Sequence, residues 1–287
     1  MTEQTLGDVT FTVDDHGTAP HRLAILTATD ADWVARLARI YRELRTARRL
    51  PDPAPSEVQL LHGVQVVDVE RLSKRLVETQ VAKRGNGNFD VVRSDFAEVL
   101  LGHVGSNYGK FRYGYISVRD RESARQPGRG IDQVGVRIDE CKALHLMLGE
   151  AKLSSENNSP PRVVDHNDDA LSKSHHKQLT NREATSERIH QAYRHSTDEE
   201  TQVLFALASH MFDDRDEHLV VHLTSLLVRP AALATISDFG SYAENPGQFG
   251  NAVVDFYVVA AQAEDIEGLI TEFAEHAGLE QEDARTS

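Results

Sequence analysis

Hydrophobic positions recur along the chain with two different spacings, and these predict a mixture of strands and helices. Short apolar or alternating runs predict strands at 21–29, 111–119, 130–139, 143–155, 218–228 and 251–261. Apolar residues three or four positions apart predict helices at 31–48, 93–105 and 265–279, and another behind residue 197. The stretch 57–79 has the pattern of a strand or loop followed by an amphipathic helix. This mixed order predicts an α/β (α+β) domain with a central sheet flanked by helices.

Capping and breaking residues predict where these elements end. Ser94 is a possible N-cap and Gly105 a possible stop for the helix at 93–105, and residues 197–200 (TDEE) have the sequence of a capping box. The segment 51–57 (PDPAPSE) is typical of a turn or short linker. A Gly/Asn-rich break at 83–90 predicts a boundary between an N-terminal region, 1–86, and a main domain, 87–287.

The stretch 144–155, LHLMLGEAKLSS, has the pattern of a buried strand that ends in charge. Four large apolar residues lie between Leu144 and Leu148, and Glu150 and Lys152 follow two positions apart. Because alternate residues of a strand point to the same face, this acid and this base are expected to lie side by side.

Length, charge and cysteine content narrow the range of functions. The 287 residues suffice for one large domain or two smaller ones, and the apolar runs are too short to cross a membrane. The polar, acidic first residues resemble neither a signal peptide nor a transit peptide, so we expect a cytoplasmic protein. A single cysteine, Cys141, excludes an internal disulfide and a cysteine-based zinc site. Its apolar neighbours predict a buried, inert thiol.

The net charge of −14 argues against a protein that grips nucleic acid by itself, since phosphate binding depends on Lys and Arg. It is compatible with a metal-dependent enzyme whose acidic cleft is neutralised by cations. It is equally compatible with a protein that receives its substrate from a partner.

Four charged residues suggest a metal-dependent hydrolase. Glu98 lies in the predicted helix among apolar residues, Asp132 lies at the start of a predicted strand, and Glu150 and Lys152 end the next one. Carboxylates on neighbouring strands can converge on Mg²⁺ or Mn²⁺, which prefer oxygen ligands. We therefore expect Asp132 and Glu150 to hold the metal, with the carbonyl of Ala151, while Lys152 activates water and Glu98 completes the shell.

This arrangement resembles the PD-(D/E)xK nuclease superfamily, whose fold is the restriction-endonuclease-like sheet. Asp132 is followed after seventeen residues by Glu150-Ala151-Lys152, and Glu98 lies upstream. Ile131 stands where the superfamily has a proline, a residue that the chemistry does not need. The resemblance implies a central mixed sheet, a divalent cation and phosphodiester hydrolysis. It leaves residues 1–86 as an N-terminal extension and possible partner surface.

The wider stretch 93–155 is similar to the HamA family, the nuclease component of bacterial Hachiman anti-phage systems. That similarity implies a DNA nuclease that is licensed by a superfamily 2 helicase of the HamB type. It also implies that the helicase engages the DNA, which would explain the acidic balance of this chain.

Other interpretations of the same residues remain open. Glu150 and Lys152 alone would be interpreted as an exposed pair at a strand end. The protein as a whole would then be a non-catalytic acidic adaptor or inhibitor on a degenerate nuclease fold, and a further alternative is a metal-dependent hydrolase of RNA or nucleotides. Lys177 and Gln178 can assist such a site, although a solvated helix face is the favoured interpretation. Asp139 and Glu140 are expected in a turn, and Lys142 on the surface.

Other catalytic motifs are absent from the sequence. It contains no HExxH, GxxxxGK[ST] or GxSxG, which argues against a zinc protease, a phosphate-loop nucleotide site and a serine hydrolase. His175-x-Lys177 matches half of a phospholipase-D-type motif, but Arg182 stands where that motif requires aspartate.

Overall fold

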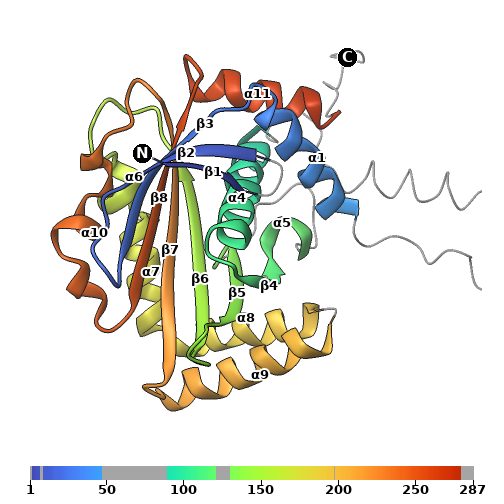
Figure 1. Cartoon of the computed structure of the whole chain (residues 1–287), viewed down its shortest axis with the longest axis vertical. Coiled ribbons are helices and arrows are strands. Elements are labelled where there is room, and N and C mark those ends of the chain that lie inside the picture. The colour runs from blue at the N-terminus through green and yellow to red at the C-terminus, as the bar shows by residue number, and fades with distance from the viewer. Residues whose placement is uncertain (1, 7–8, 47–88, 121–129, 197, 279–287) are drawn as a thin grey trace, which may run out of the picture.

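An eight-stranded mixed sheet organises the protein (Figure 1), which is described here from a computed structural model. The structure describes residues 2–6, 9–46, 89–120, 130–196 and 198–278. The strands lie in the order β1-β2-β3-β8-β7-β6-β5-β4. Their bounds are β1 Thr2–Leu6, β2 Val9–Asp15, β3 Arg22–Ala28, β4 Arg112–Ile116, β5 Gln133–Ile138, β6 Leu144–Leu153, β7 Leu219–Pro230 and β8 Val253–Ala261.

The four central strands, β3, β8, β7 and β6, run parallel, and antiparallel pairs extend the sheet at both ends. This confirms the predicted mixed α/β class. Parallel strands covered on both faces are apolar along nearly their whole length, which is why β6, β7 and β8 were recognisable in the sequence.

Helices cover both faces of the sheet. Helices α1, α4 and α11 pack on one face, and α7, α8 and α9 pack on the other (Figure 1). The helical segments are α1 Trp33–Thr46, α4 Phe89–Asn107, α5 Ser117–Asp120, α6 Arg162–Asp165, α7 Leu171–Thr180, α8 Arg182–His195, α9 Glu199–Asp214, α10 Ser241–Glu244 and α11 Ile266–His276. Short 3₁₀ turns, η1 Ile236–Phe239 and η2 Pro246–Phe249, flank α10.

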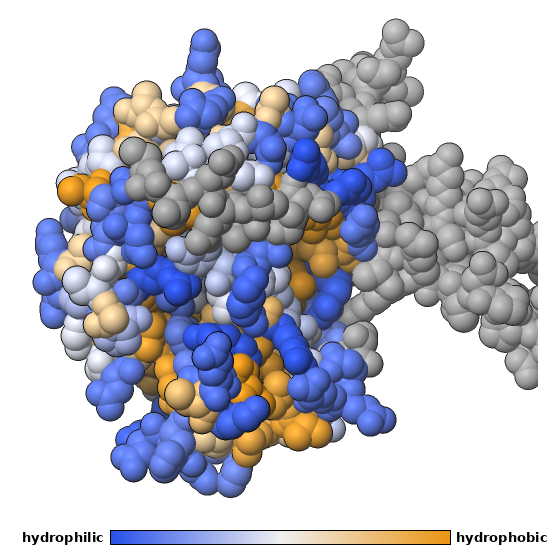
Figure 2. Space-filling view, viewed as in Figure 1, coloured by the Kyte–Doolittle hydropathy of each residue, from blue (hydrophilic) through white to orange (hydrophobic). Residues whose placement is uncertain are grey.

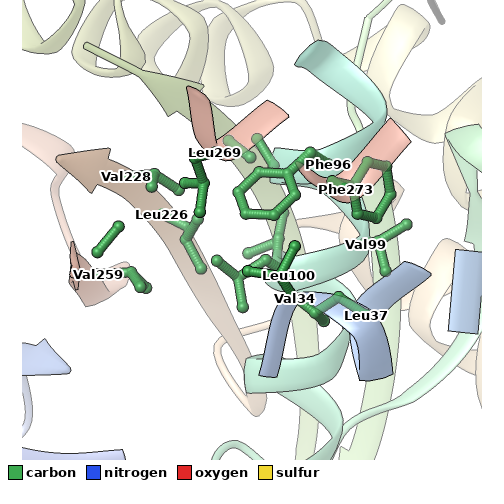
Figure 3. Close-up of a cluster of buried hydrophobic side chains, with 14 of the residues drawn as sticks. Val34, Leu37, Phe96, Val99, Leu100, Leu226, Val228, Val259, Leu269 and Phe273 are labelled. Atoms are coloured by element: carbon green, nitrogen blue, oxygen red, sulfur yellow. The ribbon is translucent and has the colours of Figure 1, made fainter. Parts of the chain in front are cut away.

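The core on the α4 side joins three helices to the central strands (Figure 3). Phe96 of α4 meets Phe273 of α11 edge to face, with ring centroids 5.1 Å apart. Leu226 and Val228 of β7 face the same cluster from the sheet. Burial of this apolar surface fixes α4, which carries Glu98, against the sheet.

Strand β6 alternates between the two cores. Leu146 and Leu148 belong to the cluster beneath α7, α8 and α9, whereas Ala151 and Leu153 pack on the α4 side. Glu150 and Lys152 continue the row of Leu146 and Leu148, so they point toward the layer that contains α7.

Several predicted element ends differ in the structure. Helix α4 begins at Phe89 and ends at Asn107, so Ser94 and Gly105 lie inside it and the predicted cap and stop are wrong. The hydroxyl of Ser94 donates instead to Glu98 Oε1 at 2.8 Å. Helix α9 is capped by Asp198, whose side chain accepts from the backbone N–H of Thr201. A carboxylate one position further along therefore provides the cap predicted for Thr197.

The N-terminal region shares the sheet of the rest of the protein. Strand β3 pairs with β8, and β2 and β1 extend the sheet beyond it, although the sequence indicated neither of these last two strands. The predicted boundary at 86 and the segment 57–79 lie outside the described residues.

The surface gives two further findings. The thiol of Cys141 is exposed, so the predicted burial is wrong: the residue lies in the turn between β5 and β6. Within the described ranges, no helix has the length and apolar character needed to cross a membrane. Hydrophilic residues dominate the face seen in Figure 2, with apolar residues interspersed among them.

Candidate active site

The pairing of β5 with β6 brings Asp132 to the motif Glu150-Ala151-Lys152. Gln133 lies opposite Gly149 in this antiparallel pair, and the N–H of Asp132 donates to the Gly149 carbonyl at 3.1 Å. In return, the backbone N–H of Ala151 donates to Asp132 Oδ2 at 2.9 Å. This return contact fixes the carboxylate of Asp132 beside the motif at the end of the strand pair.

Glu150 is buried, with 6% of its surface exposed, and this burial contradicts the interpretation of an exposed strand-end residue. Gln178 Nε2 of α7 donates to Glu150 Oε1 at 2.7 Å. Desolvation by burial raises the pKa of Glu150 to about 8; Lys152 opposes this shift, and the negative charge of Glu98 adds to it. The metal-free protein therefore holds this carboxyl largely protonated at neutral pH.

Asp132 is in a similar environment. Its pKa lies well above the usual range, first because burial disfavours the carboxylate and second because of the charge of Glu150. The hydrogen bond from Ala151 and the charge of Lys152 act in the opposite direction. Two carboxyl groups that repel each other in a water-poor site are relieved by a cation between them.

Lys152 is half-buried and its ammonium contacts Asp169 Oδ2 at 2.8 Å. Asp169 belongs to the loop between α6 and α7. Burial lowers the pKa of Lys152, but the charges of Asp169, Glu150 and Asp132 outweigh that effect and raise it overall. The lysine therefore carries its positive charge among three carboxyl groups.

Glu98 approaches from α4, on the other side of the sheet from α7. Its side chain is 2% exposed and accepts from Ser94, and Gln133 Nε2 donates to its backbone carbonyl. Its charge raises the pKa of Glu150, whereas the charges of Glu150 and Lys152 shift the pKa of Asp132, so Glu98 is linked to this group of residues through Glu150.

Gln178 differs from the prediction of a solvated helix face. It is buried and contacts Glu150, whereas the neighbouring Lys177 is exposed. The buried face of α7 consists of Leu171, Ser172, His175 and Gln178. Three of these four residues are polar, so the apolar pattern of the sequence does not show which face of the helix is buried.

A second set of buried polar groups adjoins Gln178. His175 Nδ1 lies 2.9 Å from the Tyr242 hydroxyl, and burial lowers the pKa of His175 to about 3. Ser225 of β7 lies beside Glu150 in the parallel register, and its buried hydroxyl has no hydrogen-bond partner among the described residues. Neutral hydrogen-bonding groups thus line the sheet next to the charged ones.

The donors of the site fit a magnesium ion that keeps much of its water. Among the residues that the structure describes, no three His, Cys, Asp or Glu side chains come together as ligands for one metal ion. Asp132 and Glu150 supply two carboxylates, and Mg²⁺ is commonly held by one or two carboxylates with water and substrate phosphate. In addition, Gln178 Oε1 is buried with no hydrogen-bond partner in the described part of the chain, which leaves an acceptor available for an ordered water.

The remaining predicted positions are structural. Asp139 and Glu140 lie at the turn between β5 and β6, and Lys142 is exposed with φ of 68°. Ile131, which stands in place of the proline, is buried.

No protein-family model matches this chain, and no curated protein sequence matches it. Its function must therefore be inferred from the residues of the site.

Proposed function

We propose that this protein is a Mg²⁺-dependent deoxyribonuclease that hydrolyses phosphodiester bonds. One observation carries the proposal: the carboxylate of Asp132 is held on the N–H of Ala151, beside the buried Glu150 and close to Lys152. An ion pair with a purely structural role would not need a second acid beside Glu150. It would also not need the buried amide of Gln178, which positions Glu150.

Each residue has a distinct task in this proposal. Asp132 and Glu150, with the Ala151 carbonyl, hold Mg²⁺ or Mn²⁺. The bound ion supplies a Lewis acid for the phosphate and lowers the pKa of a coordinated water. Lys152 orients the attacking water and offsets negative charge on the phosphate. Gln178 orients Glu150, and Glu98 completes the shell of the metal or its water.

Protonation couples the site to metal binding. Because its pKa is about 8, Glu150 must release a proton before its carboxylate can bind a cation at neutral pH. Cation affinity is therefore expected to rise as pH increases toward 8. This site would be inactive without the ion.

The proposed substrate and setting come from the similarity of residues 93–155 to the HamA family. We place the protein in an anti-phage defence complex, where a HamB-like superfamily 2 helicase delivers DNA and licenses cleavage. The net charge of −14 supports delivery by a partner, because the chain has more carboxylates than the Lys and Arg that bind phosphates.

The test is cleavage of linear and circular DNA in Mg²⁺, with and without the helicase and ATP. Lys152→Ala is expected to lower the rate at least about 100-fold, since it removes a charge that acts on the developing transition state. Lys142→Ala is the matched control: it removes an exposed lysine of the β5–β6 turn and should leave the rate unchanged.

Equal cutting by the wild type and Lys152→Ala would contradict the proposal. Absence of cutting under every condition, with folding and helicase binding intact, would favour the non-catalytic adaptor. Cleavage of RNA or nucleotides but not of DNA would support metal-dependent hydrolysis at this site and would contradict DNA as its substrate.

A further inference from the structure

The ion pair between Lys152 and Asp169 engages the ammonium that the proposed reaction needs. Lys152 Nζ and Asp169 Oδ2 are 2.8 Å apart, and the side chains are 24% and 73% exposed, respectively. The pair therefore lies at the border between the buried carboxyl groups and solvent. Solvent, and therefore a dissolved anion, reaches both members of the pair.

The loop that carries Asp169 is anchored on both sides. Asp165 of α6 accepts hydrogen bonds from the N–H and hydroxyl of Ser241, and Lys173 of α7 donates to the carbonyl of His166. Ala170, the residue after Asp169, is buried. These contacts hold the loop beside β6, so the position of the Asp169 carboxylate follows from the fold.

Asp169 resembles a phosphate in what it offers to Lys152. Both the carboxylate of Asp169 and a phosphate present anionic oxygens to the ammonium. The two anions therefore compete for the same position next to Lys152 Nζ. An anionic substrate therefore competes with Asp169 for the ammonium of Lys152.

We infer that Asp169 is a resident counter-ion of Lys152 that the phosphate of the substrate displaces, so that it lowers the affinity of the site for DNA. This inference rests on the proposed function, because it assumes that Lys152 meets a phosphate. Asp169 does not touch the reacting atoms and acts only through Lys152, as a positioning residue.

The ion pair between Lys152 and Asp169 is weak enough for a phosphate to replace the carboxylate. Partly exposed ion pairs contribute little free energy, since water solvates each ion well when they separate. The phosphate of a substrate can therefore replace the carboxylate of Asp169. Removing the charge of Asp169 is expected to tighten DNA binding about two- to fivefold at low salt, the range that such pairs support.

The experiment is a double-mutant cycle on the full-length protein. The affinity for a fluorescent DNA duplex is measured by anisotropy in low salt and EDTA, which prevents cleavage. The variants are wild type, Asp169→Asn, Lys152→Ala and the double variant. Asp168→Asn is the matched control, because it removes a neighbouring carboxylate that lies 3.8 Å from Lys173.

Asp169→Asn should tighten binding when Lys152 is present and have no effect in the Lys152→Ala background. Asp168→Asn should change affinity little, and equally in both backgrounds. In Mg²⁺, Asp169→Asn should lower KM for DNA without raising kcat. No tightening, or equal tightening with and without Lys152, would overturn the inference.

The proposed function is judged separately, by cleavage. If Asp169→Asn tightens binding only when Lys152 is present, while no variant cuts DNA, the inference about Asp169 holds for phosphate binding and the nuclease proposal fails. If wild type cuts and Lys152→Ala does not, but the binding cycle shows no coupling, the nuclease stands and Asp169 loses its role.

Discussion

At the scale of single residues, the buried Glu150 of the candidate site lowers the free energy of unfolding of the metal-free protein as pH rises. Glu150 is buried against a hydrogen bond from Gln178, and burial raises its pKa to about 8 from an ordinary value of 4.5. The folded state therefore binds a proton that the unfolded state has released. Between these two pKa values, stability must fall as pH rises.

Replacing Glu150 with glutamine should remove this dependence. The glutamine side chain keeps a carbonyl that can accept from Gln178, but it has no proton to lose. We expect Glu150→Gln to stabilise the metal-free protein at pH 8 by up to roughly 5 kcal/mol, since each unit of the pKa rise from 4.5 to about 8 is worth about 1.4 kcal/mol. At pH 4 the difference should nearly vanish.

Urea unfolding in EDTA at pH 4, 6 and 8 measures this effect. Glu140→Gln is a suitable control, because Glu140 is exposed in the β5–β6 turn. A Glu150→Gln variant that is less stable than wild type at pH 8 would show that the ionised carboxylate is stabilised in the fold, against the pKa assigned to it.

At the same scale, the sequence predicted the charged residues better than their neutral partners. Asp132, Glu150 and Lys152 were found because charge at a strand end is visible in a linear pattern. Gln178 was not, because its role depends on how α7 is rotated over the sheet. Asp169 was not singled out either, because an exposed loop carboxylate has no periodic signature.

At the scale of elements, close approach between β4 and α8 supports the strands of the site. A Cβ on Gly114 would collide with the carbonyl oxygen of Ala192 in α8 and with the ring of Phe205 in α9. The strand thus passes directly beneath both helices, and only a residue without a side chain fits there.

Gly114→Ala is expected to destabilise the protein by about 1–3 kcal/mol, because overpacking forces the strand and helices apart. Gly247→Ala is the control, since its Cβ would have only one neighbouring atom, at 3.8 Å, among the described residues. Denaturant midpoints of the two variants test this. Equal midpoints would show that β4 can move away from α8 at no cost.

Elements buried on both faces were predictable, whereas the two N-terminal strands at one edge of the sheet were not. The apolar runs of β6, β7 and β8 belong to strands that are covered from both sides. In contrast, β1 and β2 lie at one end of the sheet, and their segment includes acidic and threonine residues that resemble a loop. The helix ends shifted because α4 continues through Ser94 and Gly105, where packing against the core outweighs local capping preference.

At the scale of the whole molecule, the fold gathers the site from distant parts of the chain. Helix α4 brings Glu98 from one face of the sheet, α7 brings Gln178 from the other, and β5 and β6 meet between them. The sequence predicted the class of this architecture, but long-range strand pairing, such as that of β3 with β8, leaves no local signal.

The net negative charge of the protein has a role in the proposed function. A net charge of −14 opposes free binding of DNA, and Asp169 opposes it again at the site itself. Cleavage would then depend on a cation and on a partner that presents the DNA.

The most direct measurement is the rate of DNA cleavage by the helicase-containing complex in Mg²⁺ and in EDTA, for wild type, Asp132→Asn and Asp139→Asn. Asp139 is the control, because it serves the β5–β6 turn by accepting from the N–H of Ala143. The proposed site predicts cutting in Mg²⁺ by wild type and Asp139→Asn, and none by Asp132→Asn or in EDTA. Cutting by Asp132→Asn at the wild-type rate would contradict it.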